Sequence, residues 1–108
     1  MSKHLTINYI DFFDKPHFIV NLDDKGGDAL FGLLKPLFEK TMADEEFWLE
    51  EYDNAYQKAG FIEFDDLPAD IFMQAHTLIT QSNEPALTPY VGEIAKKMQA
   101  DPRYTATV

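Results

Sequence analysis

The sequence contains no cysteine among its 108 residues, which excludes disulfides, thiolate metal sites and cysteine nucleophiles. It also contains no run of about 20 apolar residues, the length that a membrane-spanning helix needs. The N-terminal segment "MSKHLTINYIDFFDK" lacks the basic flank, the apolar run and the small-residue cleavage site of a secretory signal. We therefore expect a cytoplasmic protein without a membrane partner.

Repeats, low-complexity tracts and long glycine or serine linkers are also missing. Nothing marks a domain boundary, and we expect a single domain over residues 1–108. The supply of core residues is ample, because 45% of the chain is hydrophobic and 14% is aromatic. A chain of this composition can bury enough apolar surface to fold despite its charge.

Basic residues are few, since 9 lysines and arginines oppose 19 acids and leave a net charge of −10. This sign disfavours direct nucleic-acid binding, because phosphates would be repelled. The excess charge is local. Residues 1–43 carry six acids and five bases, residues 44–70 carry ten acids and one base, and residues 71–108 carry three of each. One quarter of the chain therefore holds nearly all of the negative charge.

Hydrophobic periodicity predicts a hairpin at the N-terminus. Residues 4–10 alternate between apolar and polar side chains, and residues 17–22 are rich in apolar and β-branched ones. The intervening residues 11–16 include aspartates and a proline, which favour a turn. Residues 23–28, "DDKGGD", are expected to form a loop. Their spacing matches neither a calcium loop nor a phosphate loop.

Two helices are expected after this loop. The first covers residues 29–42 with Asp28 as its N-cap, and Pro36 should kink or split it because proline cannot donate a backbone hydrogen bond. The second covers residues 45–59 with Asp44 as its N-cap.

Gly60 should end the second helix, and residues 61–64 form either a short strand or an extended connection. A third helix begins near Pro68, and a fourth has Thr88 as its N-cap. Residues 103–108 alternate and are a candidate for a further strand. The expected fold class is α+β, with a small antiparallel sheet (the N-terminal hairpin plus one or two short strands) packed against about four helices.

The segment 44–66 is the most unusual feature, because it holds nine carboxylates and only one cation, Lys58. On a helix at 100° per residue its side chains separate into two faces. The apolar face consists of Trp48, Leu49, Tyr52, Ala55, Tyr56 and Ala59. The opposite face consists of Glu46, Glu50, Asp53 and Gln57. Phe47 falls beside the acidic row, outside the apolar face.

The simplest interpretation of this segment is an amphipathic helix with a solvated acidic face. That interpretation leaves the like-charge pairs Glu46–Glu50 and Glu50–Asp53 unexplained, since such pairs destabilise a helix and lysines would have removed the repulsion. A local rule broken without compensation is typical of a functional surface. The alternative is therefore a docking surface for a strongly basic partner.

Catalytic and metal-binding patterns are missing. No serine or threonine lies in a nucleophile motif, and no paired carboxylates have a defined geometry. His4 and His17 would approach each other if the two predicted strands pair, but two histidines without a third ligand are more often incidental. His76 is expected to be a hydrogen-bonded core or boundary residue. We expect no enzyme activity, no cofactor and no metal.

The sequence therefore favours a small acidic inhibitor, of the immunity-protein or antitoxin type, that neutralises a basic toxin such as a nuclease. The alternative is an adaptor or regulatory domain, possibly homodimeric, with the aromatic helix at an interface. Tyr52 and Tyr56 would face the core in one case and a partner in the other. The predicted partner-binding residues are Glu46, Phe47, Glu50, Asp53, Tyr56, Glu63, Asp65 and Asp66.

Overall fold

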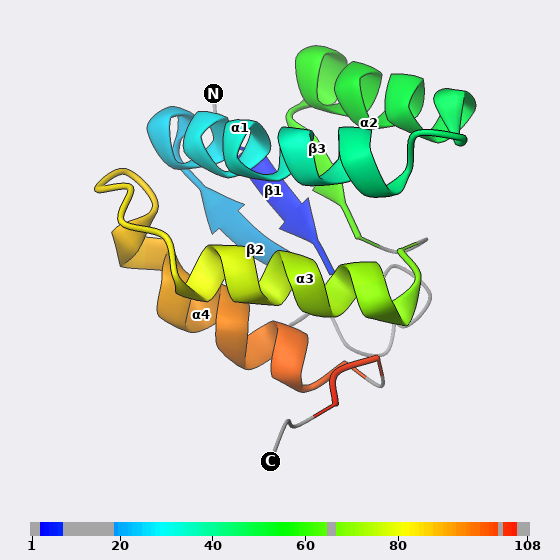
Figure 1. Cartoon of the computed structure of the whole chain (residues 1–108). Coiled ribbons are helices and arrows are strands. Elements are labelled where there is room, and N and C mark those ends of the chain that lie inside the picture. The colour runs from blue at the N-terminus through cyan, green and yellow to red at the C-terminus, as the bar shows by residue number, and fades with distance from the viewer. Residues whose placement is uncertain (1–2, 8–18, 65–66, 102, 106–108) are drawn as a thin grey trace.

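The computed structural model describes residues 3–7, 19–64, 67–101 and 103–105. Three strands and four helices lie in this part of the chain (Figure 1). In chain order they are β1 (Lys3–Thr6), β2 (Ile19–Leu22), α1 (Asp24–Thr41), α2 (Glu46–Ala59), β3 (Phe61–Glu63), α3 (Ala69–Thr80) and α4 (Thr88–Gln99). The α+β class predicted from the sequence is confirmed.

The sheet has the order β2-β1-β3. β1 and β2 pair antiparallel, with Leu5 opposite Val20, as the predicted hairpin requires. The predicted turn at residues 11–16 lies outside the described residues. Residues 61–64 were expected to form either a short strand or an extended connection, and they contain the strand β3. This strand pairs parallel to β1, with Ile62 beside Leu5. The sheet is therefore mixed.

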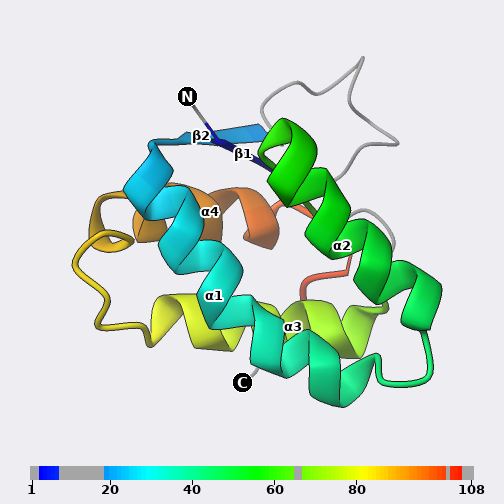
Figure 2. The same ribbon diagram turned by 90° about the horizontal axis from the view of Figure 1, so that it is seen from above.

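Helices α1, α3 and α4 lie on one side of this sheet (Figure 2). The buried sheet face, which includes Leu5, Val20 and Ile62, meets a single cluster of buried side chains from the helices. The other sheet face is more polar. There His4 Nδ1 lies 2.7 Å from Asn21 Oδ1, and the ring centroids of His4 and Phe61 are 5.2 Å apart.

The predicted loop at residues 23–28 is wrong, because α1 begins at Asp24. Asp23 is the N-cap in place of Asp28, and its carboxylate accepts a 2.7 Å hydrogen bond from the amide of Gly26. The glycines allow close packing of this first turn. A Cβ on Gly26 would lie 2.6 Å from the ring of Tyr90, and one on Gly27 would lie 2.5 Å from the side chain of Lys3. Two glycines that resemble a flexible loop in the sequence thus serve helix packing.

Of the two effects expected at Pro36, the split is not found, because α1 continues through it as one helix, whereas the kink stays a prediction. Buried residues lie on both sides of the proline, with Leu34 before it and Phe38 after it. Burying two such side chains contributes about 3–6 kcal/mol, which offsets the cost of about 3 kcal/mol for an internal proline.

The ends of α2 follow the prediction at one terminus only. Asp44 is not the N-cap; the helix begins one residue later, and Glu45 occupies the cap position without a side-chain hydrogen bond. At the other end Gly60 adopts φ 73°, the left-handed conformation that glycine tolerates best, and its amide donates to Tyr56. This turn directs the chain straight into β3.

The later helices follow the prediction more closely. α3 buries Ile71, Phe72, Ala75 and Ile79. Thr88 was expected to be the N-cap of α4. It is instead the first residue of the helix, and Leu87 is the N-cap. The expected strand at the C-terminus is not found in its described part, residues 103–105.

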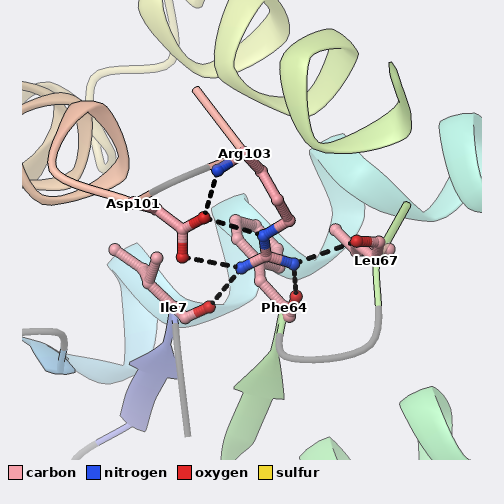
Figure 3. Close-up of polar contacts among 5 residues, drawn as sticks. All are labelled: Ile7, Phe64, Leu67, Asp101 and Arg103. Carbon is pink, nitrogen blue, oxygen red and sulfur yellow. Dashed lines mark hydrogen bonds and ion pairs between the residues drawn. The ribbon is translucent and has the colours of Figure 1, made fainter. Parts of the chain in front are cut away.

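Arg103 connects this C-terminal segment to the residues that directly follow β1 and β3 (Figure 3). Its guanidinium donates to the carbonyl oxygens of Ile7 at 2.7 Å and Leu67 at 3.0 Å, and to that of Phe64. It also donates to both carboxylate oxygens of Asp101, at 2.9 and 3.0 Å. Because Asp101 is only 3% exposed, this pair satisfies a buried charge.

Candidate functional site

Helix α2 presents two faces, as its sequence predicts. Tyr52 and Tyr56 are buried, whereas Glu46, Glu50 and Glu51 are exposed and Asp53 is half-buried. Phe47 is 77% exposed, more than any other large hydrophobic side chain in the described residues. The helix therefore carries its carboxylates and one phenylalanine on the surface.

The aromatic side chains of α2 pack against α1. Trp48, Tyr52, Phe31 and Tyr56 form a continuous stack, with successive ring centroids 5.6, 4.8 and 4.4 Å apart. Phe38 meets Trp48 edge-on at 5.1 Å. This stack places both tyrosines in the core. Tyr56, which the sequence suggested as a contact residue, is 4% exposed, so its ring is not part of an exposed docking surface.

Both tyrosine hydroxyls are satisfied inside the protein. Tyr52 donates to the carbonyl oxygen of Phe31 at 3.0 Å, and Tyr56 donates to the carboxylate of Asp28. Burial raises the pKa of Tyr52 well above its ordinary value. Burial, together with the hydrogen bond to Asp28, does the same for the pKa of Tyr56. The stack is thus a fixed, neutral support for the surface above it.

The carboxylates of α2 have no cationic partner among the residues that the structure describes. The two ion pairs found there are Lys97–Glu93, at 2.9 Å in α4, and Arg103–Asp101, at 2.9 Å. Lys58, the one cation of the acidic segment, lies in the last turn of α2, where a positive charge favours the helix dipole. The negative potential of α2 is therefore not neutralised locally.

A pocket of about 290 Å³ lies between α2 and β3. Its lining among the described residues combines acids with aromatic rings: Glu45, Phe47, Trp48, Glu51, Tyr52, Ala55 and Glu63. Phe47 and Glu63 were predicted from the sequence as contact residues. Glu45, Trp48 and Glu51 were missed. The spacing of Phe47, Glu51 and Ala55 at four-residue intervals marks this side of the helix, but only the position of β3 shows that it is hollowed.

Three other predicted contact residues, all in the described chain, lie outside this pocket. Glu46, Glu50 and Asp53 belong to the same helix but do not line it. Asp65 and Asp66 lie outside the described residues. The acidic surface thus has two parts, an outer row on α2 and a pocket between α2 and β3. We call it the α2 acidic surface, consisting of Glu45, Glu46, Glu50, Glu51, Asp53 and Glu63.

No group of three or more potential ligands for a metal is found in the described part of the chain. His4 contacts Asn21, and His17 lies outside the described residues. His76 is half-buried, approaches Gln99 at 3.2 Å, and has a pKa lowered by burial. No helix in the same ranges is both long and apolar enough to cross a membrane.

Comparison of the chain with protein-family models, with curated proteins and with solved structures found no match.

Proposed function

We propose that this protein is a small inhibitor of the immunity-protein or antitoxin type, which neutralises a basic toxin such as a nuclease by docking its α2 acidic surface. The observation that supports the proposal is the set of carboxylates on α2 and β3 without an ion-pair partner in the described chain, placed around an exposed Phe47. Carboxylates arranged in this way occupy a basic cleft where phosphates would otherwise bind.

The exposed position of Phe47 would add binding affinity to the electrostatic attraction exerted by the carboxylates. Electrostatic complementarity mainly accelerates association and selects the partner, whereas desolvated aromatic contacts carry much of the binding free energy. A phenylalanine that is 77% exposed beside a row of acids provides both kinds of contact within one turn of helix. Removing its hydration on docking therefore favours the complex.

The alternative of an adaptor with its tyrosines at an interface is less well supported, because Tyr52 and Tyr56 are 7% and 4% exposed. Phe47 is the one residue of α2 that still favours it, since a second copy could cover this side chain. Self-association through α2 would bring two acidic rows together, and like charges oppose it. A homodimer that persists unchanged at low salt would favour the adaptor.

A capture experiment tests the proposal. The immobilised protein is exposed, at about 50 mM salt, to an extract of the cells that produce it. It is then washed at about 500 mM salt, which reduces the Debye length from roughly 14 Å to 4 Å. We expect release of a basic protein whose expression alone stops growth and whose toxicity the chain suppresses. A matched matrix carries the double variant Glu50→Lys, Asp53→Lys and should retain much less of that protein.

Two results would contradict the proposal. One is the absence of any salt-released basic protein. The other is equal capture by the parent and by the charge-reversed variant.

A further inference from the structure

The pocket between α2 and β3 has rigid aromatic walls. Trp48 and Tyr52 are stacked with an interplanar angle of 12°, and Phe38 meets both of them edge-on from behind, at angles of 79° and 81°. The hydroxyl of Tyr52 is bonded to α1. Because these contacts hold the rings on the core side, the surface that they offer to the pocket is preorganised.

The lining of the pocket carries negative charge. Glu45, Glu51 and Glu63 line it, all three are exposed, and none forms an ion pair within the described residues. They come from the start of α2, the middle of α2 and β3, so they converge on the pocket from different directions. A group that entered between them would meet these carboxylates together with the rings of Trp48 and Phe47, because both faces of Tyr52 are covered by Trp48 and Phe31.

The pocket also limits the size of its occupant. A volume of about 290 Å³ is at the lower end of the range of about 300–1,000 Å³ for sites that enclose a drug-sized ligand. It suits a single long side chain better than a cofactor. Half-buried Trp48 and Phe47, which is 77% exposed, both line the pocket, so the chain carrying that side chain can lie across the outside of α2.

We propose that this pocket binds an arginine side chain of the basic partner, an inference that rests on the proposed function and specifies its central contact. Arginine fits both elements of the site. Its planar guanidinium stacks on aromatic rings, and its donors engage carboxylates in pairs. Lysine carries the same charge, but its ammonium is more strongly hydrated and cannot make the paired contact.

Trp48 makes the site observable, because it is the only tryptophan of the chain. The probes are two short blocked peptides of equal length, one alternating glycine with arginine and the other glycine with lysine, titrated at about 50 mM salt. We expect the arginine peptide to bind about tenfold more tightly than the lysine peptide and to shift the Trp48 emission. Calorimetry measures the affinities independently of the fluorescence.

Matched variants distinguish binding inside the pocket from general electrostatic attraction to the α2 acidic surface. Glu51→Gln and Glu63→Gln should each weaken the arginine peptide about fivefold or more. Glu50→Gln, on the same helix but outside the pocket, should weaken it less than about twofold, and so should Glu39→Gln on α1. All four substitutions remove one exposed carboxylate and are expected to leave the fold intact.

The outcomes distinguish the two proposals. Equal affinity for both peptides, an unchanged Trp48 emission, or an equal effect of Glu50→Gln and Glu51→Gln would overturn the arginine pocket and leave the acidic docking surface standing. Failure of both peptides to bind at low salt would overturn both proposals.

Discussion

At the scale of single residues, Arg103 connects several distant parts of the chain through one side chain. It contacts the ends of β1 and β3 and the start of α3 through carbonyl oxygens, and its guanidinium lies 4.2 Å from the ring centroid of Phe72. The carboxylate that balances it, Asp101, has a side chain only 1% exposed. Loss of the arginine would leave a buried negative charge without its principal partner, which is far more costly than the loss of a surface ion pair.

We therefore expect Arg103→Ala to lower the free energy of unfolding by about 3–5 kcal/mol, measured by urea denaturation. The double variant Asp101→Asn, Arg103→Ala should recover part of this loss, because it also removes the buried negative charge. A loss below about 1 kcal/mol in the single variant would show that the network contributes little.

The buried tyrosines predict sensitivity to alkaline pH. Folding raises the pKa of Tyr52 and Tyr56 above the unfolded value of 10.0, so above this pH the unfolded chain binds fewer protons than the folded one. Stability should therefore be constant below pH 10 with respect to these groups and should fall by about 1.4 kcal/mol per pH unit per tyrosine above it.

Urea denaturation between pH 8 and pH 11 measures this slope. The double variant Tyr52→Phe, Tyr56→Phe is the control, since it removes both phenol groups and leaves every other ionisable side chain in place. An equal slope in the parent and in the double variant would contradict the prediction.

At the scale of elements, α2 carries like charges that its own stability does not require. Glu46 and Glu50 are four residues apart and exposed on the same face. Such pairs oppose each other by a few tenths of a kcal/mol, and neither has an ion-pair partner within the described residues. We explain the retained repulsion by function, because the same carboxylates would attract and dock a cationic partner.

Glu50→Lys should therefore stabilise the free protein by roughly 0.5 kcal/mol, because it replaces a repulsive pair with Glu46 by an attractive one. Thermal or urea unfolding measures the change. Glu39→Lys on α1 is the matched control. It makes the same change in net charge, but it turns the attraction between Glu39 and Lys35, four residues apart, into a repulsion. It should therefore destabilise the free protein slightly. A destabilised Glu50→Lys variant would show that this carboxylate supports the fold.

Local rules in the sequence predicted α2 and its surroundings well, but not completely. The end of the helix at Gly60 and the exposure of Phe47 follow from glycine conformation and helical spacing, which need no tertiary information. The parallel pairing of β3 could not be predicted locally, because it depends on a chain crossover. Without β3 the pocket, and with it Glu45 and Glu51, could not be identified.

The N-terminus of α1 was mispredicted for a related reason. Two adjacent glycines indicate a loop in isolation, but here tertiary contacts with Tyr90 and Lys3 require them. Asp28 then serves as the acceptor of Tyr56, and Asp23 takes the capping position. Residues whose role depends on a distant neighbour are thus the ones that sequence patterns misassign.

At the scale of the whole molecule, charge is distributed unevenly over the chain. Of the net −10, residues 44–70 contribute −9, and most of these acids belong to α2 or lie next to it in the chain. Surface fields of one sign accelerate the association of oppositely charged proteins by orders of magnitude, and added salt removes the effect. Solubility alone would not require the charge to be concentrated on one helix.

The association rate with the captured basic protein, measured by stopped flow at about 20 mM and about 500 mM salt, tests this account most directly. We predict that the rate constant falls by at least about tenfold with salt in the parent, and that Glu50→Lys, Asp53→Lys at low salt is slower by a comparable factor. An association rate that is the same at both salt concentrations, or the same for parent and variant, would contradict the central claim that the α2 acidic surface attracts and docks a cationic partner.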